Sequence, residues 1–222
     1  MRAWRAQKGP ARLIFDSNGH AISLASTDPK FKSLIDSADV VHADGGFVVT
    51  ASRLFARAPI VERSATTDMI HDLAAESEAS GFRFFLLGGT EEVNADCAAR
   101  LKELYPGLNI CGRRNGYFKP DEEAEVIDLI NDSNADVVWV GLGKPKEQCF
   151  CIDNRKMVNA AWLITCGGCF NYITGHYKRA PRWMQKYNLE WLHRMVTNPK
   201  NLFWRYFVTT PHALLLCLLK TK

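Results

Sequence analysis

Five places in the sequence combine glycine or a short polar side chain with the end of an apolar, strand-like run. They are Asn18, Asp44, Gly88-Gly89, Gly143-Lys144 and Gly167-Gly168. In an open parallel sheet the carboxyl ends of the strands meet at one edge, and ligands bind there. Backbone N–H groups of glycines at such an edge suit the oxygens of a diphosphate. The pattern therefore predicts a nucleotide site and leaves the reaction open.

Some of these residues also have simpler explanations in local structure. Asp16, Ser17 and Asn18 precede a helical stretch at 20–26, and each could cap its free N–H groups. Asp44 precedes two glycines, which is typical of a turn. Arg63 lies in a polar connection and is available for a phosphate. The residues by themselves leave both the structural and the binding role open.

The usual nucleotide fingerprints are missing from the chain. No G-x-G-x-x-G opens a helix, and no G-x-x-x-x-G-K-[ST] occurs. Dehydrogenase and ATPase functions are therefore disfavoured. An NAD-dependent oxidoreductase and a nucleic-acid-binding module that uses a basic tail are kept as alternatives.

Strand-like and helical stretches alternate along the chain, which indicates βαβ units. This pattern predicts an α/β protein with a Rossmann-like, mostly parallel sheet and helices on both faces. A polar pair, Thr67-Asp68, is expected to cap the helix at 69–80. The expected strands are 12–15, Val40–Ala43, 82–87, 109–111, 137–140 and Trp162–Thr165; the expected helices are 20–26, 33–38, 47–55, 69–80, Glu91–Leu104 and 122–131.

Length and composition favour one main core with an appendage. The chain has 222 residues, of which 47% are hydrophobic. We expect a Rossmann-like core domain at 1–175 and a basic, aromatic-rich, helical carboxyl-terminal appendage at 176–222. The seven cysteines are scattered through apolar segments without a secretory signal before them, which favours a reducing cytosol. Cys149, Cys151, Cys166 and Cys169 could be imagined as zinc ligands, but the spacing favours small buried residues.

The positive charge is concentrated in the expected appendage. Residues 176–222 contain nine Lys and Arg but a single acid, Glu190, which gives +8 and leaves −4 for the rest of a chain of net charge +4. The segment is also rich in aromatic residues, so it could face an anionic membrane or a nucleic acid, or it could be a solvated helical face. Its last apolar run, 213–219, is far shorter than the roughly 20 residues that span a bilayer, so if this segment meets a membrane, we expect it to lie on the surface.

A series of short motifs resembles the WecG/TagA/CpsF family of bacterial glycosyltransferases. The resemblance extends from about Leu13 to Phe207, and the string between Gly167 and Arg205 is highly specific. The motifs occur in one order: Asn18, His42-Ala43-Asp44-Gly45, Phe85-Leu86-Leu87-Gly88-Gly89, Gly116-Tyr117-Phe118, Val140-Gly141-Leu142-Gly143-Lys144-Pro145-Lys146, Lys178-Arg179-Ala180-Pro181 and Leu189-Glu190-Trp191-Leu192-x-Arg194.

The resemblance implies an enzyme that moves N-acetylmannosamine, its uronic acid or a hexose from a UDP-sugar donor to a polyprenyl-diphosphate-linked acceptor. Such an enzyme takes part in cell-surface polysaccharide synthesis. It is cytoplasmic and lies peripherally on the inner surface of the bacterial cytoplasmic membrane. The resemblance also implies an inverting reaction with no cofactor, no metal and no nucleic acid. A homo-oligomer is left open.

The resemblance assigns roles to matching residues in this chain. Asp44 falls on the family's general base. Asp16 stands where threonine is usual, and its carboxylate could influence Asp44 or itself be the base. The family's usual P-x-Q-E reads Pro145-Lys146-Glu147-Gln148 here, so the acid and the amide have exchanged places. The residues expected to bind substrate are Asn18, Arg63, Gly88, Gly89, Gly143, Lys144, Pro145, Glu147, Gln148, Gly168, Lys178, Arg179 and Arg205.

Overall fold

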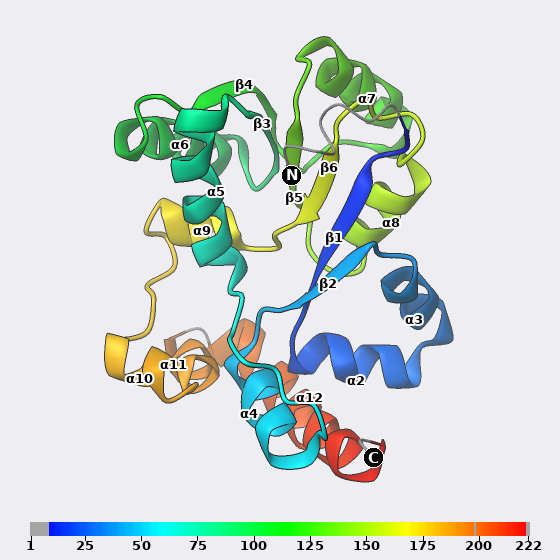
Figure 1. Cartoon of the computed structure of the whole chain (residues 1–222), viewed down its shortest axis with the longest axis vertical. Helices are drawn as coiled ribbons and strands as arrows, with labels where there is room; N and C mark the ends of the chain where they lie inside the picture. Colours follow the sequence, from blue (N-terminus) through cyan, green and yellow to red (C-terminus); the bar gives the residue numbers. More distant parts are fainter. Residues whose placement is uncertain (1–8, 198, 221–222) are drawn as a thin grey trace. The chain divides into compact units, whose positions relative to one another are not determined.

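One parallel sheet organises the protein. The computed structural model describes residues 9–197 and 199–220, without the side chains of 199–201, 205, 206 and 220. Within these residues, the sheet has six strands in the order β2-β1-β6-β5-β3-β4 (Figure 1). The α/β, Rossmann-like prediction is confirmed. The strands are β1 (Arg12–Ser17), β2 (Val40–Ala43), β3 (Arg83–Gly88), β4 (Asn109–Arg114), β5 (Val137–Gly141) and β6 (Trp162–Thr165).

Helices separate successive strands, as the alternating pattern predicts. Four of the later helices, α8 to α11, are short: α8 and α9 were not among the expected helices, whereas α10 and α11 lie in the appendage that was expected to be helical. The helices are α2 (Gly19–Thr27), α3 (Pro29–Asp36), α4 (Gly46–Phe55), α5 (Thr66–Ser80), α6 (Glu91–Leu104), α7 (Glu123–Asp132), α8 (Lys146–Asp153), α9 (Cys169–Ile173), α10 (Arg182–Lys186), α11 (Glu190–Thr197) and α12 (Pro199–Lys220).

Several predicted boundaries are wrong for identifiable reasons. Helix α3 begins at Pro29 because Asp28 caps it, accepting the N–H of Lys30 at 2.9 Å. Helix α5 begins at Thr66, so the expected cap Thr67-Asp68 lies inside its first turn, where an acid suits the helix dipole. Strand β4 continues past Cys111 because its pairing with β3 extends to Arg114.

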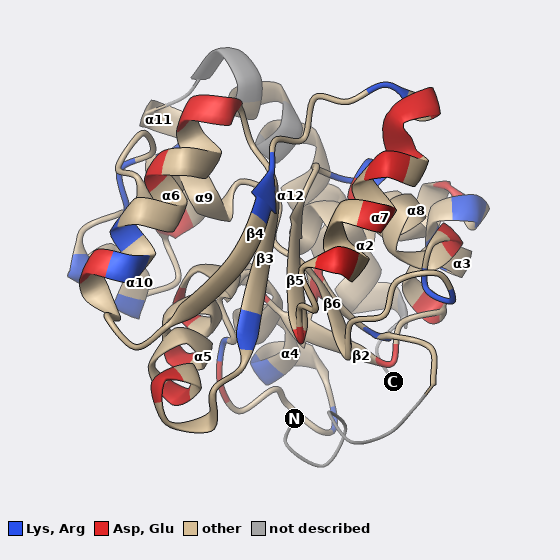
Figure 2. Ribbon diagram, turned by 90° about the horizontal axis from the view of Figure 1, so that it is seen from above, with Lys and Arg blue, Asp and Glu red and all other residues tan. Residues whose placement is uncertain are grey.

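The central strands are buried on both faces. Phe84, Leu86, Trp139 and Ile164 are fully inaccessible and belong to one hydrophobic cluster, which also contains apolar residues of α5, α6 and α9. Such continuous apolar strands are typical of a parallel sheet covered by helices. Acids of the covering helices are exposed instead, such as Asp72 and Glu76 of α5 and Asp128 of α7. The positions of the acids along these helices are red in the ribbon of Figure 2.

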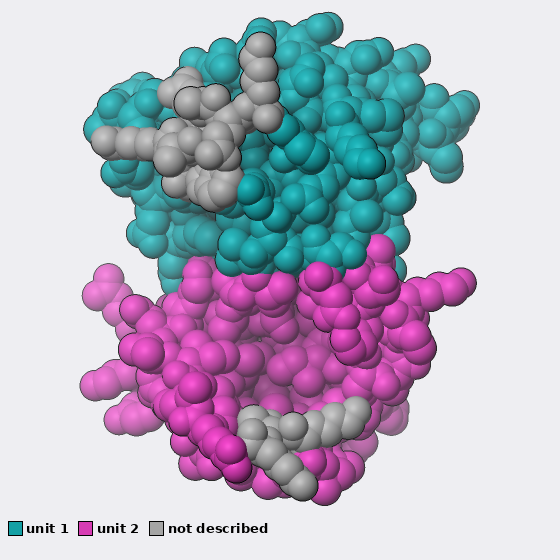
Figure 3. All heavy atoms as spheres, turned by 45° about the vertical axis from the view of Figure 1, so that its right-hand side comes forward, with its two compact units in different colours: residues 1–15, 37–40, 66–177 teal, residues 16–36, 41–65, 178–222 magenta. Residues whose placement is uncertain are grey.

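Contacts divide the chain into two compact units, coloured separately in Figure 3. Unit 1 consists of residues 1–15, 37–40 and 66–177, and unit 2 consists of residues 16–36, 41–65 and 178–222. Unit 2 therefore combines the carboxyl-terminal segment with two segments from the amino-terminal part of the chain. Within it, α12 packs against α2, α4 and α11.

Helix α12 is longer than the apolar run at 213–219 suggests. It has 22 residues, and its stretch from Leu202 to Leu219 is long and apolar enough to cross a membrane by length and composition. The run at 213–219 contains only the final aliphatic residues, whereas α12 also contains the aromatic residues that precede them. One face of α12 is packed, since Ala213 is fully buried and His212 bonds to Ser23 of α2 at 2.8 Å.

Candidate active site

Three glycine turns in unit 1 come together where β3, β5 and β6 end. Gly88 has a φ of +137°, and a Cβ atom there would lie 2.3 Å from the carbonyl oxygen of Gly141. A Cβ atom on Gly141 would in turn lie 2.9 Å from the carbonyl oxygen of Gly167. Side chains at Gly88 or Gly141 would push these backbones apart. The glycines therefore allow the ends of neighbouring strands to approach closely.

The turn after β5 carries several of the expected binding residues. Glu147 and Gln148 are fully buried, and the Nε2 of Gln148 donates to the Oε1 of Glu147 at 3.4 Å. The Oε2 of Glu147 accepts the N–H groups of Gly143 at 3.0 Å and of Gly167 at 3.1 Å. These two N–H groups, expected to face a diphosphate, are thus bonded to Glu147. Lys144 is mostly buried, with its Nζ 3.8 Å from the Oε1 of Glu147.

Other expected residues of unit 1 adjoin the same turns. Gly89 donates its N–H to the carbonyl of Gly141 at 3.3 Å. Pro145 directly precedes α8, and a Cβ atom on Gly168 would lie 3.5 Å from the ring of Tyr177. The structure therefore brings the expected glycines of unit 1 together around the ends of β3, β5 and β6.

Sequence reasoning missed two further residues at these turns. Asn94 is fully buried on α6, and its Nδ2 lies 2.8 Å from the carbonyl oxygen of Gly88 and 3.2 Å from that of Arg114. It therefore links the ends of β3 and β4. The available signal was its spacing, because Asn94 lies on the same helical face as the buried Cys97 and Leu101.

The second missed residue, Lys146, contacts the loop after β4. Its Nζ lies 4.8 Å from the centre of the Phe118 ring and 3.4 Å from the carbonyl oxygen of Gly116. The first contact is a cation–π interaction. The sequence indicates Lys146 only as part of a motif, because one lysine in a polar turn carries no signal of its own.

In unit 2, Asn18 and Asp44 lie in adjacent turns. The N–H of Asp44 donates to the carbonyl of Ser17 at 2.9 Å, and a Cβ atom on Gly45 would lie only 3.1 Å from that of Asn18. Asn18 caps α2 by accepting the N–H of Ala21 at 3.1 Å, which confirms the capping role for this residue. Asp16 is buried and 5% exposed, whereas Asp44 is only half-buried.

A carboxylate lies between two of the expected substrate-binding arginines of unit 2. The Nη1 of Arg63 lies 2.6 Å from the Oε2 of Glu190, and the Nε of Arg179 lies 4.0 Å from the Oε1. The backbone beside Arg63 is held by β2, because the Nδ1 of His42 donates to the carbonyl of Ser64 at 2.8 Å. The structure thus brings Arg63 and Arg179 together around Glu190.

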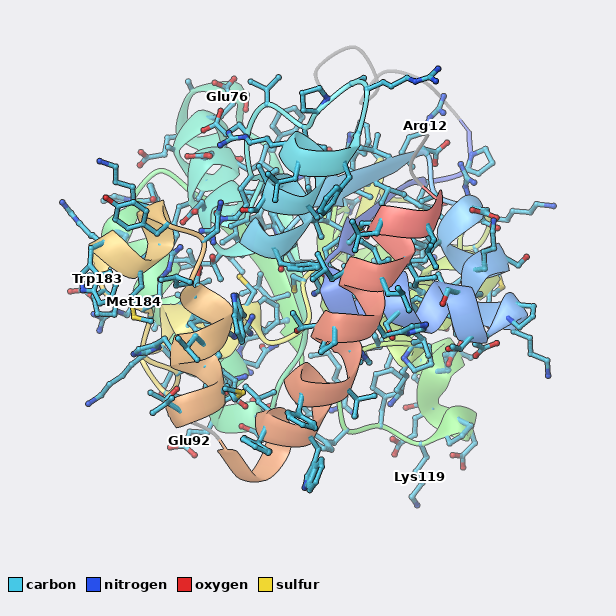
Figure 4. The ribbon with its side chains drawn as sticks, turned by 90° about the horizontal axis from the view of Figure 1, so that it is seen from below. Arg12, Glu76, Glu92, Lys119, Trp183 and Met184 are labelled. Atoms are coloured by element: carbon cyan, nitrogen blue, oxygen red, sulfur yellow. The ribbon has the colours of Figure 1, made fainter. Side chains whose placement is uncertain are left out.

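Lys178 and Arg205 are the other residues of the basic segment that were expected to bind substrate. Lys178 is exposed, and the side chain of Arg205 lies outside the described residues. Near Lys178, α10 presents an aromatic residue, Trp183, that is 58% exposed (Figure 4).

The cysteines lie in apolar surroundings. Cys151, Cys166 and Cys169 are buried, as expected for small core residues, whereas Cys149 is partly exposed. Burial raises the pKa of the Cys151 thiol well above its ordinary value, and the charge of Glu147 adds to this effect. In the part of the chain that the structure describes, no group of three or more His, Cys, Asp or Glu residues is arranged to hold a metal.

Comparison with known proteins assigns the chain to a family. Residues 1–222 match the family described as "Glycosyl transferase WecG/TagA/CpsF family". The chain belongs to this family. The match covers every turn described above, from Asn18 to Arg179, and confirms the resemblance carried by the sequence motifs. The protein is therefore a glycosyltransferase.

A curated relative agrees with this assignment for the glycosyltransferase. The chain is 33% identical over 187 residues to the N-acetylglucosaminyldiphosphoundecaprenol N-acetyl-beta-D-mannosaminyltransferase of Bacillus spizizenii (strain ATCC 23059 / NRRL B-14472 / W23). The similar region covers 84% of this chain and 71% of the relative.

Proposed function

We propose that this glycosyltransferase moves N-acetylmannosamine, or a related sugar such as its uronic acid or a hexose, from a UDP donor to a polyprenyl-diphosphate-linked N-acetylglucosamine. The observation that carries the proposal is the 33% identity to a relative whose name specifies an N-acetylmannosaminyl transfer to that kind of acceptor. The product would enter the synthesis of a bacterial cell-envelope polysaccharide.

The charge distribution of unit 1 favours the turn after β5 as the site of the donor diphosphate. Lys144 and Lys146 flank the start of α8, where the helix dipole also favours an anion. The first turn of α8 also contains an acid, Glu147, so the two lysines leave this helix start with a charge of +1, whereas α6 begins with two acids, Glu91 and Glu92. Of the amino-terminal ends of α6 and α8 in unit 1, the end of α8 is therefore the better site for the negatively charged diphosphate of UDP.

Asp44 is the proposed general base. In an inverting transfer, a carboxylate takes the proton of the acceptor hydroxyl while that oxygen attacks the anomeric carbon, and UDP departs from the opposite side. Asp44 is accessible enough for this role, whereas Asp16 is 5% exposed. Basic side chains would stabilise the departing UDP without a metal.

The basic residues of unit 2 suit a diphosphate on the acceptor. Guanidinium groups match phosphate oxygens in a forked geometry. Arg63 and Arg179 share one carboxylate, that of Glu190, so the three side chains keep a net charge of +1 that can attract a phosphate. Lys178 is exposed and directly precedes Arg179 in the sequence, and Arg205 adds a basic residue to the sequence of α12.

Helix α12 supports a peripheral position on the cytoplasmic face of the membrane. Its packed face includes Ala213 and His212. Between Leu202 and Leu219 the only charged residue is Arg205. A helix with one packed and one apolar exposed face can lie in the membrane interface. The exposed residues are Phe203, Trp204, Phe207, Val208, Leu214, Leu215, Leu218 and Leu219.

Thermal unfolding with three ligands tests the proposed donor. UDP should raise the midpoint of unfolding, because a ligand that binds only the folded protein stabilises it. NAD and a single-stranded oligonucleotide should leave the midpoint unchanged. Stabilisation by NAD alone would favour the oxidoreductase alternative, and stabilisation by the oligonucleotide alone would favour a nucleic-acid-binding module.

A further inference from the structure

We propose that Glu147 is a positioning residue that ties the turn after β5 to the turn after β6 and so shapes the surface that receives the donor nucleotide. The positioning role rests on the proposed UDP-dependent function, whereas the tie itself is independent of it. In this chain, the carboxylate at this position would thus act on the protein backbone rather than directly on the sugar.

A single carboxylate oxygen makes the tie. The Oε2 of Glu147 accepts the N–H of Gly143 at 3.0 Å and the N–H of Gly167 at 3.1 Å. Gly143 follows β5, and Gly167 follows β6, the strand paired with β5. Both glycines have a left-handed backbone, with φ of +78° and +49°. Each turn therefore depends on glycine for the conformation in which its N–H reaches Glu147.

A local helix cap explains only half of this arrangement. Glu147 is in the first turn of α8, so its bond to Gly143, four residues earlier, could simply satisfy the start of that helix. The bond to Gly167 spans 20 residues of sequence and contributes nothing to α8. It joins two separate turns, which is the contact expected of a residue that fixes their relative position.

The charge at Glu147 also matters for its neighbours. Its side chain is fully buried, with the Nζ of Lys144 at 3.8 Å and the Nε2 of Gln148 at 3.4 Å from its Oε1. A glutamine at 147 could turn its oxygen toward the two glycines. Its NH₂ group would then face the ammonium of Lys144 and the NH₂ of Gln148, and these three groups are all hydrogen-bond donors that cannot bond to one another. A buried carboxylate satisfies all these donors at once.

The test compares Glu147→Gln with Glu92→Gln in the full-length protein. Glu92 is an exposed acid in the first turn of α6, so its substitution makes the same chemical change without a buried contact (Figure 4). Hydrogen exchange at the amides of Gly143 and Gly167, followed by NMR, reports the tie directly. We expect E147Q to speed both exchanges and to weaken UDP binding, each by about tenfold, with kcat at saturating donor changed less than about twofold. E92Q should have the same amide exchange rates, the same UDP affinity and the same kcat as the wild type.

Several outcomes would overturn the proposal. Unchanged exchange in E147Q would show that there is no tie, and faster exchange with unchanged UDP affinity would show that the tie does not position the donor. If E147Q does not fold, hydrogen exchange in the wild-type protein still tests the tie. Exchange of the Gly143 or the Gly167 amide at the rate of an unprotected glycine would show that Glu147 does not hold that amide. A wild-type protein that does not bind UDP would refute the proposed donor, while the exchange data would still report the tie.

Discussion

Two aspartates near the amino terminus differ in their suitability for proton transfer. Asp16 is buried at the end of β1, whereas Asp44 is half-buried in the turn between β2 and α4. A general base must reach the hydroxyl that it deprotonates. Accessibility therefore favours Asp44, even though the sequence offers both carboxylates at the ends of strands.

The first prediction concerns this assignment. Asp44→Asn should lower kcat by about 10²–10⁴-fold, because the amide cannot accept the proton of the acceptor hydroxyl. The affinity for UDP, measured by calorimetry, should stay the same. Asp36→Asn provides the control, since Asp36 is an exposed acid of unit 2 that pairs with a lysine of its own helix, α3. Turnover in D44N equal to that of the wild type would rule out Asp44 as the base.

Glu190 gives a second prediction for single residues. The Arg63–Glu190 pair is mostly buried and joins segments that are 127 residues apart in sequence. A double-mutant cycle with Arg63→Ala and Glu190→Ala should give a coupling free energy of about 1–3 kcal/mol in urea unfolding. The exposed Lys32–Asp36 pair is the matched control and should give about 0.3–0.5 kcal/mol. Additive effects of the Arg63 and Glu190 substitutions would show that the pair does not hold these segments together.

At the scale of elements, most strands and several helices follow from local patterns. Strand β2, α6 and β6 have the predicted bounds, because apolar runs and caps such as Thr90 define them locally. The short helix α8 was missed because its first turn resembles a polar loop. The contacts of Asn94 and Glu147 were beyond prediction, since they depend on which strands lie side by side. Glycines at strand ends were identified correctly, but their role in close backbone packing required the structure.

The amino ends of the strands give a prediction about pH. Asp39 accepts the N–H of Leu13 at 2.8 Å and bonds to Arg12 at 2.9 Å and Arg155 at 2.6 Å. Burial by itself raises the pKa of Asp39, but these donors outweigh it and hold the pKa below its ordinary value. Because the folded-state pKa is lowered, the stabilisation is complete above the ordinary value near 3.9 and is lost as the pH falls through the folded-state pKa.

Asp39→Asn should therefore reduce the free energy of unfolding by about 1–3 kcal/mol near pH 7. The difference between wild type and variant should stay constant from about pH 5 to pH 8 and shrink below about pH 4. Urea unfolding across this range measures it. A difference that is as large at pH 3 as at pH 7 would contradict the role of the Asp39 charge.

At the scale of the whole molecule, the chain folds into two units made from discontinuous segments. Unit 1 contains the glycine turns and Glu147, and unit 2 contains Asp44, the arginines and α12. The sequence predicted a basic appendage, but it gave no sign that residues 178–222 pack with helices from the amino-terminal part of the chain. Such packing depends on contacts distant in sequence, which periodicity does not report.

The exposed face of α12 predicts binding to membranes. Phe207→Glu and Leu218→Glu place a charge on that face and should reduce partition into vesicles that contain anionic lipid by about tenfold or more. Leu104→Glu is the matched control, because Leu104 is 52% exposed on α6 while Leu218 is 51% exposed on α12. Vesicle flotation measures the partition. Equal partition of F207E, L218E and L104E would show that α12 does not contact the membrane.

The proposed reaction of the protein is the transfer of a sugar from a UDP donor to a lipid-linked acceptor. Its most direct test is to incubate the full-length protein with individual UDP-sugars and a synthetic polyprenyl-diphosphate-linked N-acetylglucosamine, and to weigh the products by mass spectrometry. We predict that the acceptor gains one sugar, with UDP-N-acetylmannosamine as the preferred donor, and that D44N gives almost no product. An acceptor whose mass stays unchanged with every UDP-sugar, under conditions where the protein is folded, would contradict the account.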